Sequence, residues 1–229
     1  MKKYIVNTLL MTSKLLVKKN LDGAFLNNIK KVNLGCGLHC SSGWLNIDGS
    51  LTSLLGTNMT LLNKVIYKVA GSSAYYSFDH FNEVIKNKKL YWRDLTEKIP
   101  LADDSVDIVF SSHFLEHLTK TKGEQFLNDI YRIMKPGGLM RILVPDLDIA
   151  IQKFNQGEIN ETLDLFFYTS EEADFSAHKY NYTFGSLKTK LEEIGFKNVV
   201  RQSHQKGECP DIEFLDVYPD HSLYVEAKK

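Results

Sequence analysis

The sequence predicts an α/β fold, in which a mostly parallel sheet carries helices on both faces. Three observations support this prediction. Short apolar runs alternate with amphipathic helical stretches along the chain. The first run ends in the glycine-rich turn Leu34-Gly35-Cys36-Gly37, and the second ends in an acid, Asp48. Because ligands of such sheets bind beyond the carboxyl ends of the strands, we expect the functional residues at that edge.

The individual elements follow from residue spacing and from turn residues. Helix 124–135 is predicted from Phe126, Ile130 and Ile133, which share one face, and Pro136-Gly137-Gly138 is expected to end it. A second helix, 184–194, has apolar residues at helical spacing and is closed by Gly195. The apolar runs predict strands at 31–34, 44–47, 106–110, 139–144, 197–201 and 222–227.

Composition narrows the class of protein. The chain has 229 residues and 26.2 kDa, with 43% hydrophobic and 24% charged residues, as is usual for a folded domain. Lys and Arg total 28 and balance 28 Asp and Glu, which disfavours a protein built around nucleic-acid phosphates. Three cysteines fit a reducing compartment better than secretion, so we expect a cytoplasmic protein.

The neutral total hides an uneven distribution of charge. Residues 1–47 carry seven lysines and one acid, Asp22, so the remainder of the chain is acidic. We expect residues 1–30 to form a helical lid or edge segment, with weak contact to a membrane surface as an alternative use of its basic helix. Its apolar stretch is too interrupted to span a bilayer. Residues 31–229 then form the main domain, with a helical insertion at 49–89.

The residues at the strand ends indicate a nucleoside ligand. Gly35 and Gly37 allow the backbone to turn tightly and to approach a ligand, and Asp48 can accept hydrogen bonds from ribose hydroxyls. Asp94-Leu95 could bind an adenine amino group and cover the ring. A nicotinamide-dependent oxidoreductase is an alternative, although Cys40 stands where the dinucleotide fingerprint requires a third glycine.

Five segments in this order resemble the class I S-adenosylmethionine-dependent methyltransferases, and within them the type 11 methyltransferase-domain family. These are Val32-Asn33-Leu34-Gly35-Cys36-Gly37, Asp48, Asp94-Leu95, Phe110-Ser111-Ser112-His113-Phe114-Leu115-Glu116-His117 and Met134-Lys135-Pro136-Gly137-Gly138. The resemblance covers residues 32–199 and the last strand. The run Gly43-Trp44-Leu45-Asn46-Ile47-Asp48 also resembles a subgroup often associated with bacterial glycan loci.

The resemblance implies a Rossmann-like, doubly wound sheet of seven strands, mostly parallel with an antiparallel last strand. It implies S-adenosylmethionine as the cofactor, with the binding residues Leu34, Gly35, Cys36, Gly37, Asp48, Asp94, Leu95, Ser112 and His113. One spacing departs from the family. Asp48 follows Gly37 so closely that the helix usually found there must be short or missing.

Methyl transfer from a sulfonium is an in-line displacement, so alignment of donor and acceptor supplies much of the acceleration. A hydroxyl acceptor also needs a base. The candidates are His113 at a strand end, His178 in a polar aromatic segment, and Asp146 after a strand. A structural hydrogen-bonding role is the alternative for each of them, and for Asp146 in particular a helix cap.

No metal is expected. A zinc site at Cys36, His39 and Cys40 would need distant Cys209 as its fourth ligand. A divalent ion on Asp146, Asp148 and His178 is a second alternative. The neighbouring Glu116 and His117 are expected to serve packing or the hydrogen bonds at a helix start.

The sequence therefore predicts a methyltransferase that is a monomer or homodimer and acts on a small-molecule or saccharide acceptor. A cofactor-binding module without turnover and an RNA methyltransferase are the remaining alternatives. The neutral charge disfavours the second of these.

Overall fold

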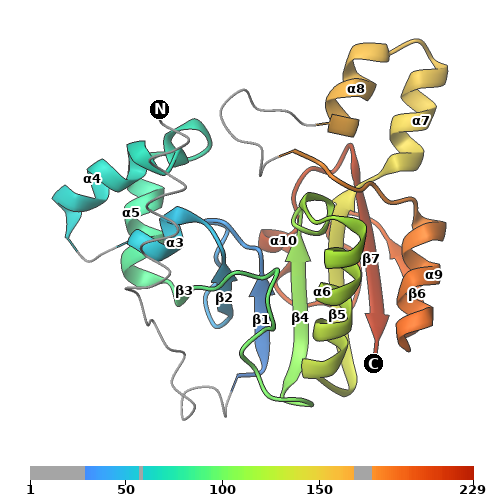
Figure 1. Cartoon of the computed structure of the whole chain (residues 1–229), viewed down its shortest axis with the longest axis horizontal. Coiled ribbons are helices and arrows are strands. Elements are labelled where there is room, and N and C mark those ends of the chain that lie inside the picture. Colours follow the sequence, from blue (N-terminus) through green and yellow to red (C-terminus); the bar gives the residue numbers. More distant parts are fainter. Residues whose placement is uncertain (1–28, 57–58, 168–176) are drawn as a thin grey trace.

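A computed structural model describes residues 29–56, 59–167 and 177–229. The predicted N-terminal segment, apart from its last two residues, lies outside the described residues. A seven-stranded sheet in the order β3-β2-β1-β4-β5-β7-β6 organises the chain (Figure 1). The strands are β1 (Lys31–Leu34), β2 (Leu45–Asp48), β3 (Leu90–Trp92), β4 (Val106–Ser112), β5 (Met134–Pro145), β6 (Lys197–Gln202) and β7 (Ser222–Lys228).

The direction of the strands confirms the predicted fold. From β3 to β5 every neighbouring pair is parallel, whereas β7 runs antiparallel to both β5 and β6. Strand order reverses between β1 and β4, because the chain builds outward through β2 and β3 before it returns to the other side of β1. This switch point opens the carboxyl edge between the two halves of the sheet to a ligand.

One face of the sheet packs against α6 (Lys120–Ile133) and α9 (Phe184–Ile194) (Figure 1). Helix α6 begins at a Thr119 cap, whose hydroxyl accepts the Lys122 N–H, and α9 begins with a capping box at Thr183. Apolar residues at helical spacing on both helices join alternate strand residues in the main core. The expected helices at 124–135 and 184–194 are therefore present, the first beginning four residues earlier and ending at Ile133.

The opposite face is covered differently from the expectation of helices on both sides. Among the described residues, the helix that contributes to the core cluster of this face is the four-residue α10 (Ile212–Leu215), together with Trp44 and Phe110. Among the described residues no helix joins β1 to β2, as the short spacing between Gly37 and Asp48 required. Trp44 fills this face instead, and its indole N–H donates to Asp211 at 2.7 Å.

A buried ion-pair network also lies on the α10 face. The Arg141 guanidinium is fully buried and contacts Asp216 at 2.5 Å and Glu226 at 2.9 Å. It donates further to the carbonyls of Lys206 and Ser203. Arg141 on β5 and Glu226 on β7 are register partners, so the pair ties the antiparallel strand to the parallel sheet. Because the charges are paired and hydrogen-bonded, their burial is tolerated, but removing one partner would be costly.

Two helical additions stand at the carboxyl edge (Figure 1). The first comprises α3 (Leu51–Leu55), α4 (Thr60–Val69), η1 (Ser72–Ala74) and α5 (Phe78–Asn87), within the stretch 49–89 expected to form a helical insertion. The second comprises α7 (Leu147–Asn155) and α8 (Ile159–Phe167), which the apolar pattern did not single out as helices. The short η2 (Leu115–His117) connects β4 to α6.

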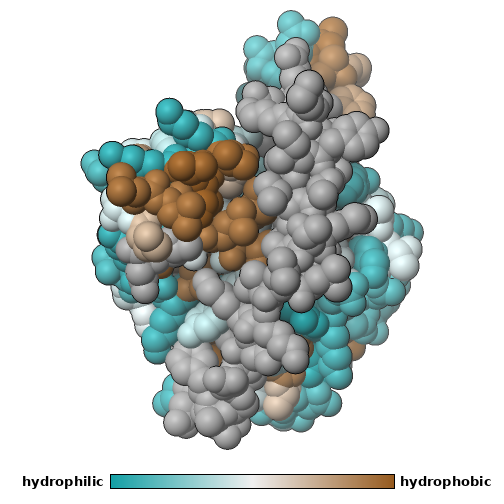
Figure 2. Space-filling view, turned by 60° about the vertical axis from the view of Figure 1, so that its left-hand side comes forward, coloured by the Kyte–Doolittle hydropathy of each residue, from teal (hydrophilic) through white to brown (hydrophobic). Residues whose placement is uncertain are grey.

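The insertion also exposes an apolar surface. Figure 2 shows apolar side chains gathered on this side of the molecule. The exposed members near and on α4 are Met59, Leu61, Leu62, Val65 and Val69. Within the part of the chain that the structure describes, no helix is long and apolar enough to cross a membrane.

One turn prediction was wrong. Pro136-Gly137-Gly138 was expected to lie between helix and strand, but these residues belong to β5, which begins at Met134. The pairing of β5 with β4 shifts register there, between Val106 and Ile108. A bulge accommodates Gly137 at φ 79°, and the strand continues through the proline because the irregular pairing does not need its missing N–H.

Candidate functional site

The turn after β1 lies at the switch point and is held by backbone and carboxylate contacts. The Gly35 N–H donates to the Ile47 carbonyl at 2.9 Å, and the Gly37 N–H donates to Asp48 Oδ2 at 2.8 Å. Both glycines have positive φ, 71° and 52°, which a side chain would disfavour. The second predicted glycine, Gly37, is therefore in direct contact with the predicted ribose acid, Asp48, across the carboxyl ends of β1 and β2.

Asp48 holds two segments at once. Its Oδ1 accepts the Ser50 N–H at 2.8 Å, just before α3, while Oδ2 holds the glycine turn. The residue is only 8% exposed. An ionised carboxylate offers about four acceptor positions, so each oxygen retains capacity for a further hydrogen bond. Asp48 can thus fix the turn and still accept a ligand hydroxyl.

Neighbouring aromatic rings close over the two glycines. A Cβ added at Gly35 would collide with the Phe114 ring, and one added at Gly37 would lie 3.2 Å from Tyr76 Oη. The glycine at position 35 is therefore required by Phe114 as well as by its φ angle.

The helical insertion packs directly on the turn. Cys36, Leu38 and Cys40 form a buried cluster with residues of α4 and α5 such as Ile66 and Phe81. The Cys36 and Cys40 sulfurs lie 3.8 Å apart, and burial raises the pKa of the Cys36 thiol well above its usual value. Cys209 belongs to a different cluster under α10, so the structure does not assemble the zinc set considered from the sequence.

Asp94 and Leu95 follow β3 at the same edge. Asp94 Oδ1 accepts the Thr96 N–H at 3.0 Å and its hydroxyl at 2.7 Å, which makes a tight turn. The Leu95 side chain is buried in the main core. Any adenine contact would therefore come from the Asp94 carboxylate and the backbone of the turn more than from the Leu95 side chain.

The end of β4 carries Ser112 and His113. The Ser112 hydroxyl is buried and makes no hydrogen bond within the described residues. His113 adopts φ 49°, its N–H donates to the Leu143 carbonyl at 2.9 Å, and its ring is partly exposed. His113 Nε2 lies 2.8 Å from Ser222 Oγ, and Nδ1 lies 3.3 Å from Glu116 Oε1. The imidazole is thus held on both sides.

Residues of the turn just before the last strand complete the surroundings of His113. Tyr218 meets its ring edge-on at 4.8 Å, and His221 lies 6.3 Å away, centroid to centroid. Burial lowers the pKa of His221, and the neighbouring His113 adds to the effect. Sequence reasoning missed Tyr218, His221 and Ser222, because no local pattern indicates that the turn before β7 returns to the end of β4.

Glu116 lies beside this histidine and is completely buried. Its Oε1 is 3.3 Å from His113 Nδ1 and 3.9 Å from His117 Nε2. Burial raises the pKa of the Glu116 carboxyl, but contacts with His113 and His117 outweigh it, so the pKa lies below its ordinary value. The packing role expected for this residue does not account for a carboxylate placed between two imidazoles.

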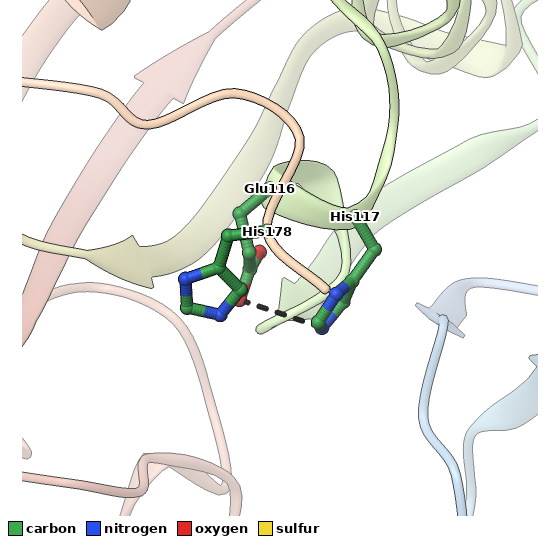
Figure 3. Close-up of side chains that lie close together, drawn as sticks. All are labelled: Glu116, His117 and His178. Carbon is green, nitrogen blue, oxygen red and sulfur yellow. Dashed lines mark ion pairs between the residues drawn. The ribbon is translucent and has the colours of Figure 1, made fainter. Parts of the chain in front are cut away.

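His178 and Asp146, the other two candidate bases, occupy different surroundings. His178 lies near Glu116 and His117 (Figure 3). Asp146 caps α7 by accepting the Asp148 N–H at 3.0 Å and forms an ion pair with Arg201. Burial raises the pKa of Asp146 despite that ion pair. The structure therefore gives Asp146 the contacts of a helix cap, the alternative considered from the sequence.

His178 does not lie within metal-sharing distance of Asp146 and Asp148. Among the residues that the structure describes, the His, Cys, Asp and Glu side chains close enough to share an ion are Glu116, His117 and His178. The divalent site considered at Asp146, Asp148 and His178 is therefore not assembled.

Comparison with known proteins finds a family that matches the central part of the chain. The sequence profile of the "Methyltransferase domain" family, Methyltransf_11, matches residues 33–142. No curated protein matches the chain. Among solved structures, a SAM-dependent methyltransferase from Archaeoglobus fulgidus is similar at 17% identity and TM-score 0.49, covering 100% of this chain and 95% of that one.

Two further structures have comparable similarity. A SAM-dependent methyltransferase, possible histamine N-methyltransferase, from Thermotoga maritima has 13% identity and TM-score 0.49, with 100% of this chain and 90% of that chain covered. A S-adenosylmethionine-dependent methyltransferase from Mesorhizobium loti has 15% identity and TM-score 0.44, with 96% of each chain covered. Residues 33–142 are therefore similar to a methyltransferase domain, and the similarity rests on the family profile.

Proposed function

We propose that the enzyme binds S-adenosylmethionine along the turn 34–37 and methylates a hydroxyl of a small-molecule or saccharide acceptor. The cofactor site comprises Leu34, Gly35, Cys36, Gly37, Asp48, Asp94, Leu95, Ser112 and His113. The observation that carries the cofactor site is the contact between the Gly37 N–H and the Asp48 carboxylate, which joins the glycine turn to the ribose acid.

The residues of the site fit this cofactor. Gly35 and Gly37 leave the turn without side chains, and Asp48 retains acceptor capacity for ribose hydroxyls. The buried Ser112 hydroxyl, which has no partner among the described residues, can donate to or accept from a polar group of the ligand. S-adenosylmethionine supplies an electrophilic methyl group when bound.

The reaction needs alignment and, for a hydroxyl acceptor, removal of one proton. The bound cofactor would give its methyl group to the acceptor oxygen, its sulfur would keep the electron pair of the carbon–sulfur bond, and the acceptor's proton would pass to a base of this chain. His113 is the base that we favour, because it stands at the carboxyl end of β4 and its ring is held between Ser222 and Glu116. To act as a base, Nε2 would exchange its contact with Ser222 Oγ for the acceptor hydroxyl, while Glu116 keeps its contact with Nδ1.

The insertion forms the wall of the site on the side of β1. Its α4 and α5 pack against Cys36, Leu38 and Cys40, and His80 Nε2 lies 3.1 Å from the Leu38 carbonyl. We propose that this lobe limits which acceptors reach the cofactor. A saccharide acceptor agrees with the resemblance of residues 43–48 to glycan-locus methyltransferases.

The experiment measures transfer of labelled methyl groups from S-adenosylmethionine to a panel of monosaccharides, nucleotide sugars and small phenols, with RNA as the comparison. The proposal expects transfer to a member of the first three classes and none to RNA. His113→Asn should lower kcat by a larger factor than it weakens the Kd for S-adenosylhomocysteine. Preferential methylation of RNA would contradict the acceptor class, and an equal loss of kcat and of cofactor affinity would contradict the base role.

A further inference from the structure

The segment 177–182 lies beside η2, just after β4, and is fixed there by backbone hydrogen bonds. The Lys179 N–H and the Tyr180 N–H both donate to the Glu116 carbonyl, at 2.7 Å and 3.2 Å. The chain then meets Asp146 through an isolated bridge at Tyr182. These contacts place His178 beside η2, although 61 positions separate His178 from His117 in the sequence. Backbone hydrogen bonds therefore hold His178 close to Glu116 and His117.

Glu116 faces this junction with an unsatisfied carboxylate. Its side chain is 0% exposed, and neither oxygen accepts a hydrogen bond from the described residues. The ring nitrogens of His113 and His117 lie 3.3 Å and 3.9 Å from Oε1. A buried carboxylate is costly unless a cation or donors compensate it. The buried Glu116 carboxylate would therefore be stabilised by a positively charged partner.

The orientation of His117 indicates what kind of partner fits. Its Nδ1 lies 3.3 Å from the Ala177 carbonyl, which can only accept, so this nitrogen carries the proton. In the neutral ring, Nε2 then presents a lone pair toward the Glu116 oxygen. Metal-bound histidines commonly donate their other ring N–H to a backbone carbonyl in this manner. Two electron-rich atoms facing each other are stabilised by a cation between them.

His178 supplies the third donor. One ligand atom each from Glu116, His117 and His178 lie within 4.8 Å of one another, and Figure 3 shows the three side chains converging. Around an ion at about 2.0–2.2 Å, neighbouring ligand atoms are separated by roughly 3 Å. Small rotations of the two histidine side chains would therefore bring the three atoms into coordination distance.

We propose that Glu116, His117 and His178 form a divalent metal site, of the class that takes Mn²⁺, Fe²⁺, Co²⁺ or Zn²⁺. Two imidazoles and one carboxylate are suited to these first-row ions, whereas Mg²⁺ and Ca²⁺ prefer oxygen ligands throughout. Three protein ligands leave coordination positions open for water or for an oxygen of another molecule. The ion would lie next to His113, at the edge where the acceptor is expected.

The alternative occupant of the junction is a proton. An imidazolium at His113 or His117 would also neutralise Glu116, with no metal involved. A metal ion and a proton can be distinguished by titration. Only a metal site binds added ions with a defined stoichiometry, and only a metal site loses them when His178 is changed. This difference determines the experiment, and its readout does not depend on cofactor binding or on the acceptor.

The test is titration of the purified, chelator-treated chain with Mn²⁺, followed by electron paramagnetic resonance of the free ion. Mn²⁺ is the preferred probe because the thiol pair Cys36 and Cys40 could capture softer ions such as Zn²⁺. We expect one bound ion per chain. Glu116→Gln and His178→Asn should each weaken binding roughly 10- to 100-fold or more.

His204→Asn is the matched control, because His204 packs on Tyr224 away from the cluster. It should bind Mn²⁺ like the wild type. Thermal melting shows whether each variant is folded, and if Glu116→Gln is not, the partly exposed His178→Asn carries the test alone. Wild-type chain that takes up no Mn²⁺ at saturating concentrations, or uptake that His178→Asn leaves unchanged, would overturn the proposal.

Discussion

Replacing Asp48 by asparagine tests the residue on which the cofactor turn depends. Asp48 accepts the Gly37 N–H and the Ser50 N–H, both at 2.8 Å, and is almost buried. Asparagine keeps one oxygen acceptor but presents an NH₂ group toward the other N–H. One hydrogen bond to a charged group is lost, and such bonds contribute about 1.5–3 kcal/mol.

Asp48→Asn should therefore reduce the free energy of unfolding by about 2 kcal/mol, or roughly 4–8 °C in Tm for a chain of this size. If the carboxylate also holds the ribose hydroxyls, the Kd for S-adenosylhomocysteine should rise roughly 10- to 100-fold. Urea unfolding measures the first effect, and isothermal titration calorimetry measures the second.

Ser50→Ala provides the matched control. It removes the side-chain cap of α3, a contact of 3.3 Å to the Ser53 N–H, but leaves the Ser50 backbone N–H on Asp48. A cap of this kind contributes about 1 kcal/mol, so stability should fall modestly while cofactor affinity stays unchanged. If Asp48→Asn unfolded at the wild-type urea concentration and bound S-adenosylhomocysteine equally well, the role assigned to this carboxylate would be refuted.

Three further predictions concern residues around the site and the core. Gly35→Ala should destabilise the chain more than Gly43→Ala in urea unfolding, because both glycines have positive φ but only the first would meet the Phe114 ring; equal losses would contradict the packing described. Arg141→Met should cost about 3–5 kcal/mol by leaving its two buried carboxylates unpaired, whereas Lys153→Met at an exposed pair should change stability little; similar effects of the two would exclude the network as a main stabilising feature. Because the pKa of Glu116 is lowered in the folded chain, its contribution to stability is present above the unfolded value of 4.5 and is lost as pH falls through the folded value; acid unfolding of Glu116→Gln should therefore depend less steeply on pH below 4.5, and identical slopes would refute this origin.

Much of the sheet was predictable because its strands and helices are locally encoded. The run 31–34 forms β1 as predicted. The apolar spacing also predicted both ends of α9 correctly, and Gly195 ends this helix as expected. The antiparallel β7 came only from the family resemblance, since strand direction leaves no trace in residue spacing. The continuation of β5 through Pro136-Gly137-Gly138 was missed because turn residues and bulge residues are the same types.

The site residues that directly follow strands could be predicted from the sequence. Those contributed by segments distant in the sequence could not. The contact between Gly37 and Asp48 joins neighbouring strands, so both residues were found by position alone. The surroundings of His113 come from the segment before β7, which no local pattern connects to β4. Glu116 was assigned to packing because its unsatisfied carboxylate is visible only once the fold has buried it.

Calorimetric titration of the wild-type chain with S-adenosylhomocysteine, compared with NADH, tests the cofactor site most directly. Both ligands carry an adenosine, but only the first carries the methionine end expected beside the turn 34–37. The proposed site predicts saturable binding of one S-adenosylhomocysteine per chain and no comparable binding of NADH. Preferential binding of NADH, or no binding of S-adenosylhomocysteine, would contradict it.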